Sequence, residues 1–167
     1  MALIATICIC IPFIPSALFS SLSNLMVAPN KYIFWSFCVG VMILIFLKST
    51  NRDLNLREIF WITYLFVISL VEEITFRLSI PLVATEFFGI GLFWFYVFLS
   101  NTLFAIIHYF TLRWKIRACI LAFLGGMAFS RLFETTEDLA LVIILHWAIT
   151  FLNTPTPPKI ENLAMKN

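Results

Sequence analysis

Five side chains capable of chemistry lie in segments that are otherwise apolar. Glu72, Glu73 and Arg77 stand between two apolar stretches, and His108 and His146 lie in later apolar segments. A charge at the centre of a membrane-spanning helix costs at least ~2.5–3.5 kcal/mol, so such residues are rare, face the protein interior and usually have a function. Carboxylates and imidazoles supply most general bases. The pattern predicts a reaction site within a membrane.

The spacing of the charged residues assigns them different roles. Glu73 and Arg77 are four residues apart, so on a helix they share a face and can pair. Glu72 is rotated away by about 100°. One carboxylate is therefore expected to be held by the arginine, and the other to be available as a general base. The alternative is that the helix ends near Val71 and the cluster is a buried ion pair with a spare glutamate.

Composition places the chain in a membrane. Its 167 residues are the length of one domain, 62% of them are hydrophobic and only 12% are charged, and the mean hydropathy is +1.00. Soluble domains carry roughly 25% charged residues. A span needs about 20 apolar residues, and the apolar runs predict an all-α, polytopic membrane bundle of about six transmembrane helices. The expected spans are 2–22, 32–47, 59–80, 91–112, 116–129 and 139–152.

Local sequence features shape these spans. Pro12 and Pro15 should kink the first. The fifth is short, and Gly125-Gly126 within it would allow close approach of another helix. The spans divide the chain into three segments: 1–57 with two helices and a cytoplasmic loop, 58–153 with a four-helix core, and 154–167. The last is expected to be a disordered tail, because Thr-Pro-Thr-Pro-Pro-Lys cannot continue a helix.

The turn between the third and fourth spans decides whether Glu72 and His108 can meet. These spans are antiparallel, so the two side chains are level only if the turn is centred near residue 90. Gly89-Ile90-Gly91 supplies a break there, and segment 81–88 would then extend the third helix outward.

Basic residues set the orientation of the bundle. With six spans, eight lysines and arginines outside the membrane fall on one side, and only Lys31 and Arg131 fall on the other. Lysine and arginine are enriched in cytoplasmic loops, so both termini are expected in the cytoplasm. The eight are Lys48, Arg52, Arg57, Arg113, Lys115, Arg117, Lys159 and Lys166.

The order of these motifs resembles that of a known family. Glu-Glu-x-x-x-Arg is followed by Phe-x-x-x-His (Phe104 to His108), a glycine-containing helix and a histidine late in the last helix. Over about 59–153 the chain is similar to the CPBP family of CAAX-processing and bacteriocin-processing intramembrane proteases, also called the Abi family, and to its compact bacterial members. The resemblance implies that Glu72 activates water with the help of His108, and that His146 helps to stabilise the oxyanion.

The chain departs from the family pattern in two places. The family usually has an asparagine four residues after the last histidine, whereas this chain has Thr150, and Asn153 comes only at the seventh position. A threonine hydroxyl can still donate a hydrogen bond to an oxyanion. Leu78 follows the arginine of the first motif, where the family often has glycine.

No cofactor is expected, and zinc is the alternative. Two histidines and one or two glutamates could ligate zinc with an open position. The chain has no His-Glu-x-x-His helix, however, and the resemblance implies a glutamate-type mechanism without a metal ion.

These observations predict an intramembrane endopeptidase that cuts near the end of a membrane-associated or lipidated protein or peptide. It is expected as an integral protein of a bacterial inner (plasma) membrane, with its substrate and the bilayer as partners and no nucleic acid. The oligomeric state is not indicated. One alternative is a catalytically silent bacteriocin-immunity or scaffold protein. Another is a small proton- or ion-coupled transporter, although the repeated halves with broken helices typical of transporters are not visible.

Overall fold

Helices dominate the described structure. The computed structural model describes residues 6–7, 10–154 and 156–157, and no strand occurs among them. Four helical stretches in this part of the chain are long and apolar enough to cross a membrane, which confirms the expected helical membrane bundle. They are Pro29–Ser49, Leu56–Phe88, Ile90–Leu112 and Ile116–Thr136.

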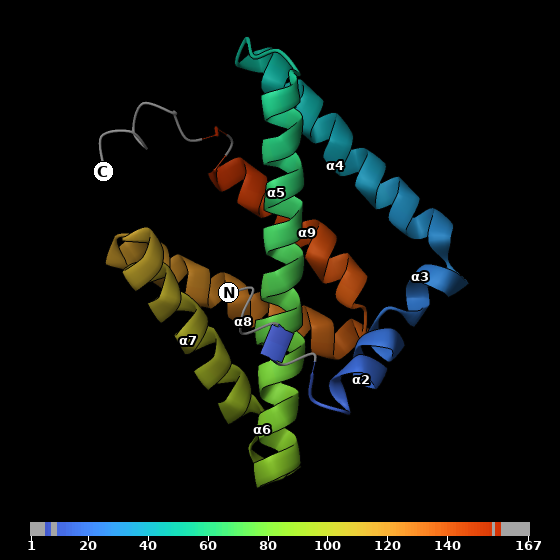
Figure 1. Ribbon diagram of the computed structural model, residues 1–167, viewed down its shortest axis with the longest axis vertical. Helices are drawn as coiled ribbons and strands as arrows, with labels where there is room; N and C mark the ends of the chain where they lie inside the picture. The colour runs from blue at the N-terminus through green and yellow to red at the C-terminus, as the bar shows by residue number, and fades with distance from the viewer. Residues whose placement is uncertain (1–5, 8–9, 155, 158–167) are drawn as a thin grey trace.

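The first two of these helices start at residues suited to a helix N-terminus. α4 (Pro29–Ser49) has its proline in the first turn, where the missing N–H is no loss. α5 (Leu56–Glu73) is capped by Asn55, whose side-chain oxygen accepts the N–H of Glu58 at 3.0 Å. In Figure 1 the end of α4 meets the start of α5, and the two helices then diverge.

A single long helix runs through the site region. α5 continues without a break through a π-helical segment, η1 (Ile74–Ser79), into α6 (Ile80–Phe88), which is the long green column in Figure 1. Within η1, the Ser79 hydroxyl donates to the carbonyl of Ile74, five residues earlier, at 2.8 Å. The wider π turns directly precede Pro81, whose ring would clash with the carbonyl four residues before it in a regular α-helix. The expected continuation of the third helix through 81–88 is thus confirmed.

The chain reverses at Gly89, as its sequence predicted. Gly89 has φ of +88°, a value that L side chains rarely adopt. A short 3₁₀ turn, η2 (Ile90–Leu92), leads into α7 (Phe93–Leu112), which packs against α6 and η1. α8 (Ile116–Thr136) packs along α7, and α9 (Leu139–Asn153) packs along α5 and α4.

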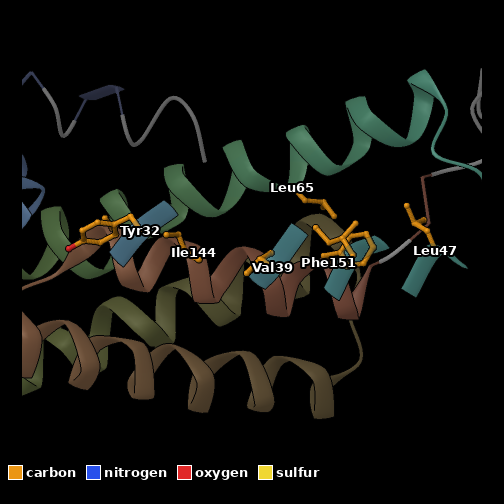
Figure 2. Close-up of a cluster of buried hydrophobic side chains, with 8 residues drawn as sticks. Tyr32, Val39, Leu47, Leu65, Ile144 and Phe151 are labelled. Atoms are coloured by element: carbon orange, nitrogen blue, oxygen red, sulfur yellow. The ribbon is translucent and has the colours of Figure 1, made fainter. Parts of the chain in front are cut away.

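The largest apolar cluster joins α4, α5 and α9. Figure 2 shows Tyr32 and Ile144 toward one end of this cluster, and Leu47 and Phe151 toward the other. α4 contributes half of the buried side chains in this cluster, and it therefore helps to hold α9 against α5. The buried members are Tyr32, Val39, Ile43, Leu47, Leu65, Ala140, Ile144 and Phe151.

The prediction of one kinked first span at 2–22 is wrong for its described part. Pro12 lies in a turn, and helix α2 (Ile14–Ser21) begins only after it, followed by a separate α3 (Ser23–Val27). Pro15 stands in the first turn of α2, the helical position that tolerates a missing N–H. The two prolines therefore end and restart the helix instead of bending it. Residues 1–5 and 8–9 lie outside the described residues.

The predicted fifth span, 116–129, is too short. α8 continues to Thr136, beyond the end of its apolar run. Its last turns are held by the ion pair between Arg131 and Glu134 at 2.8 Å, and the hydroxyl of Thr136 donates to the carbonyl of Leu132 at 2.8 Å. The apolar composition predicted only the part of α8 that is suited to lipid. The ion pair and the hydrogen bond of its last turns stabilise the helix beyond that part.

Two expected spans correspond to shorter apolar helical stretches, Ile14–Val27 and Leu139–Asn153. The second agrees closely with the predicted range 139–152. Of the expected disordered tail, 154–167, residues 155 and 158–167 lie outside the described residues.

Candidate active site

Three charged side chains lie buried where α5 passes into the π-helical segment. Glu72 is 5% exposed, Glu73 0% and Arg77 4%. The Nε atom of Arg77 lies 3.2 Å from Oε2 of Glu73, the pairing that their spacing predicts. Glu72 ends on a different face of the helix and contacts other partners.

The Glu72 carboxylate faces two histidines from two other helices. Its Oε1 lies 3.7 Å from Nε2 of His108 on α7, and its Oε2 lies 3.7 Å from Nε2 of His146 on α9. Both histidines are buried. A distance of 3.7 Å is longer than a direct hydrogen bond. The fold thus brings together the three residues whose types suggested chemistry, and neither histidine makes a direct hydrogen bond to the carboxylate.

Glu73 connects the arginine to the second histidine. Its Oε1 lies 2.6 Å from Nδ1 of His146, while its Oε2 faces Arg77. Neither contact has the angles of a hydrogen bond. Glu73 and Arg77 therefore interact through their opposite charges, and Glu73 and His146 do so when His146 is protonated. The sequence did not reveal the contact with His146, because it depends on how α9 is aligned against α5.

The same antiparallel alignment places Thr150 beside Ser69. Each lies one helical turn from the Glu73–His146 contact, and the hydroxyl of Ser69 is 3.4 Å from that of Thr150. Ser69 is fully buried and donates to the carbonyl of Leu65 at 2.9 Å. Asn153, in contrast, is exposed at the end of α9. The structure therefore keeps Thr150 near the site and leaves Asn153 away from it.

Phe104 holds two site residues in place. Its carbonyl lies 2.8 Å from Nδ1 of His108, and its ring centroid is 4.3 Å from that of the same imidazole. The guanidinium carbon of Arg77 lies 4.5 Å from the Phe104 ring centroid, a favourable cation–π distance. Trp114, in the α7–α8 loop, covers the imidazole of His108 with ring centroids 4.7 Å apart.

Asn101 is a buried polar residue that sequence reasoning missed. It is 0% exposed, and its Nδ2 donates to the carbonyl of Val97 at 2.9 Å and to the hydroxyl of Ser130 at 3.0 Å. A Cβ on Gly126 would lie 2.1 Å from Oδ1 of Asn101 and 3.0 Å from Nη2 of Arg77. The glycine pair in the fifth span was the available signal, and its second member lets α8 approach the arginine.

In the part of the chain that the structure describes, no group of three or more His, Cys, Asp or Glu side chains is arranged so that it could hold a metal ion. Glu73, one of the expected ligands, contacts Arg77 and Nδ1 of His146 instead.

Comparison with known families decides the classification. Residues 55–152, more than half of the chain, match the family model of the type II CAAX prenyl endopeptidases described as Rce1-like. The chain belongs to this family. The match confirms the resemblance drawn from the motifs, and it spans α5 to α9, leaving α2 to α4 outside. With four long apolar helices, this Rce1-like protein is an integral membrane protein of a protease family. Searches of curated proteins and of solved structures gave no match.

Proposed function

We propose that this Rce1-like protein is an intramembrane endopeptidase that cleaves near the end of a membrane-associated or lipidated protein or peptide. The family supports the class of reaction. The arrangement of Glu72 between His108 and His146, with one histidine nitrogen 3.7 Å from each carboxylate oxygen, supports the assignment of groups.

Glu72 and His108 are suited to activate water. A carbonyl only accepts hydrogen bonds, so Nδ1 of His108 carries the proton shared with Phe104, and Nε2 of the neutral ring has a lone pair. This lone pair and the carboxylate are two acceptors that face each other across 3.7 Å. A water molecule can donate one O–H to each acceptor, which polarises its oxygen for attack on a peptide carbonyl. The proton taken up can later pass to the leaving amine.

His146 is suited to stabilise the negative charge that develops on the carbonyl oxygen. Its Nδ1 lies 2.6 Å from the Glu73 carboxylate, which is a favourable charge contact when the ring is protonated. Protonated His146 then also presents an N–H at Nε2, next to Glu72, where it can donate to the oxyanion. Glu73, supported by Arg77, orients the imidazole in the way that carboxylates orient histidines at other catalytic centres. The Thr150 hydroxyl would be a second donor.

We propose no metal ion in this mechanism, because the two histidines are assigned to water activation and oxyanion stabilisation. We further propose that the protein lies in a bacterial plasma membrane with both termini in the cytoplasm. Reporter fusions at Arg52, Arg113 and the C-terminus should then report the cytoplasm, and those at Asn30 and Thr135 the opposite side. A C-terminus on the far side would contradict this orientation.

The mechanism is tested with purified protein in detergent and peptides that end in an apolar or lipidated segment. Glu72→Gln is nearly isosteric and should keep the fold and substrate binding, while turnover falls about 10²–10⁴-fold. Glu134→Gln, at the glutamate that pairs with Arg131 outside the site, is the matched control and should remain active.

Three results would contradict the proposal. Full activity of Glu72→Gln would remove the assigned base. Activity that a chelator abolishes and zinc restores would show a metalloenzyme. A wild-type protein that binds such peptides but cleaves none would support a silent immunity or scaffold protein instead.

A further inference from the structure

An apolar groove runs between α7 and α8 on the surface of the bundle, and no carboxylate of the described residues lines it. It has a volume of about 370 Å³ and is open along one side. Several of its residues are among the exposed large hydrophobic side chains, including Ile106, Tyr109, Ile116 and Ile120. No described segment of the chain covers it, so in a membrane this groove faces lipid.

The groove begins directly below a cluster of basic side chains. Tyr109 and Ile116, at one end of the groove, flank the α7–α8 loop, which carries Arg113 and Lys115, and Arg117 follows in the first turn of α8. All three basic residues are exposed. None of them has an ion-pair partner among the described residues, in contrast to Arg52 and Arg131. The end of the groove therefore presents three cations that no described residue neutralises.

We propose that this groove and loop bind one anionic, diacyl phospholipid. An acyl chain would lie in the groove, and the phosphate would contact Arg113, Lys115 and Arg117. Basic residues at the membrane surface attract anionic lipids, but charge alone would not fix a lipid at one position. The groove supplies the position, and the charges select the headgroup.

The dimensions of the groove fit this ligand. The stretch of α7 from Thr102 to Tyr109 is ~10 Å long at ~1.5 Å per residue, and the stretch of α8 from Ile116 to Phe123 is equally long. The hydrocarbon core of a bilayer is ~30 Å thick, so the groove covers most of one leaflet. Tyr109 lies at the end nearest the headgroups, where aromatic side chains are enriched.

The wall of the groove is shared with the candidate active site. Ala105 lines the groove and lies one helical turn before His108 on α7. On the α8 side, the thiol of Cys119 lies 3.8 Å from the carbonyl of Trp114, whose ring covers His108. A bound lipid would therefore stabilise the contact between α7, the loop and α8, and hold Trp114 against the imidazole.

Lipid binding can be measured by native mass spectrometry on the full-length protein in neutral detergent. The probes are phosphatidylglycerol, phosphatidylcholine with identical acyl chains, and glycerol phosphate without chains. One molecule of phosphatidylglycerol should bind several-fold more tightly than phosphatidylcholine, and it should raise the melting temperature, because a ligand that binds only the folded state stabilises it. Glycerol phosphate should bind far more weakly than the whole lipid.

Matched variants separate the two parts of the site. Arg113→Gln, Lys115→Gln and Arg117→Gln should each weaken binding of phosphatidylglycerol by roughly fivefold, whereas Lys48→Gln, at the end of α4, should not. Ile106→Trp fills the groove and should weaken both lipids. Leu99→Trp, at a similarly exposed position on α7 outside the groove, should weaken neither.

Several outcomes would overturn the proposal. Equal binding of the two lipids would show ordinary, unselective lipid contact. Equal binding of glycerol phosphate and phosphatidylglycerol would remove the groove from the site, and unchanged binding in the three loop variants would remove the cations. Loss of peptide cleavage in Ile106→Trp with unchanged lipid binding would assign the groove to the substrate.

Discussion

Two buried carboxylates of this protein have very different surroundings. Asp138, at the start of α9, is 1% exposed and accepts hydrogen bonds from Lys31 at 2.8 Å, from the hydroxyl of Tyr32 at 2.7 Å and from the N–H of Leu141 at 3.0 Å. Glu72 is nearly as buried, yet its histidine contacts are 3.7 Å long.

The contrast indicates which buried polar group can do chemistry. A carboxylate whose oxygens are all engaged is a structural connector, because its lone pairs are committed and its geometry is fixed. Asp138 ties α4 to α9 in this way. A buried carboxylate with open contacts is costly to keep, and this cost is reasonable where the open positions are used by substrate and water. Glu73 is intermediate, since it contacts both Arg77 and His146.

Arg77→Ala tests the structural side of the site and should have the largest effect on stability. It removes the guanidinium that pairs with the buried carboxylate of Glu73, and breaking a buried ion pair costs ~3–5 kcal/mol. The variant should melt at a much lower temperature in detergent or fail to accumulate. Arg131→Ala removes an exposed ion pair worth ~0–1 kcal/mol and is the control. Equal melting temperatures for the two variants would show that Glu73 does not depend on Arg77.

Gly126→Ala tests the close approach of α8 to the site. The added Cβ would collide with Oδ1 of Asn101, and overpacking of this kind costs ~1–3 kcal/mol. The neighbouring Gly125 has nothing within 4 Å of an added Cβ, so Gly125→Ala should be neutral or stabilise the helix by ~0.5–1 kcal/mol. Thermal unfolding of the two variants compares them directly. A melting temperature for Gly125→Ala that is lower than that of Gly126→Ala would contradict the packing described for Gly126.

Asp138 should make stability depend on pH. Burial raises the pKa of this carboxyl, but the hydrogen bonds from Lys31, Tyr32 and the backbone of Leu141 outweigh burial, so its pKa lies below the usual value. A lowered pKa means that the contribution of Asp138 is complete above the unfolded pKa of about 3.9. That contribution is lost as the pH falls through the folded pKa.

The corresponding variant is Asp138→Ala, which removes the cap of α9 and should cost ~0.5–2 kcal/mol at neutral pH. Its melting temperature should fall less than that of the wild type when the pH is lowered below about 4. Identical pH profiles for the two proteins would contradict the role given to Asp138.

Thr150→Asn should have the smallest effect. An asparagine side chain can keep a hydrogen bond to Ser69 and can also donate to an oxyanion, so the melting temperature should be nearly unchanged and kcat should be retained or raised. Measurement of kcat and KM on the same peptide checks this expectation. A loss as large as that of Glu72→Gln would show that the threonine is required in a way that its contact with Ser69 does not explain.

The sequence predicted those features that depend on local spacing. The Glu73–Arg77 pair follows from their separation by four residues, and the levelling of Glu72 with His108 follows from the turn at Gly89. Features that depend on the alignment of distant helices were out of reach. The contact of His146 with Glu73, and the burial of Asn101 against Ser130, both need the relative position of two helices, which no local pattern specifies.

The first span shows a different limit of sequence reasoning. Apolar composition predicted one helix through Pro12 and Pro15, but composition measures the preference for lipid and not the continuity of hydrogen bonding. Because Pro12 and Pro15 have no backbone N–H to donate, the helical hydrogen bonding is interrupted there, and α2 begins only at Ile14. In η1 the opposite happened: the long helix stays continuous as far as Pro81 by widening its turns, which a count of apolar residues cannot indicate.

The π-helical segment also affects how the protein tolerates changes in length. A π turn holds an additional residue compared with an α turn, and each residue of an α-helix adds about 100° of rotation. A single-residue deletion within Ile74–Ser79 could therefore return that stretch to α-helix while α5 and α6 keep their facing directions. The same deletion within α5 would turn Glu72 and Glu73 out of phase with their partners. Natural deletions of one residue other than Arg77 should accordingly be better accepted in η1 than in the helix before it.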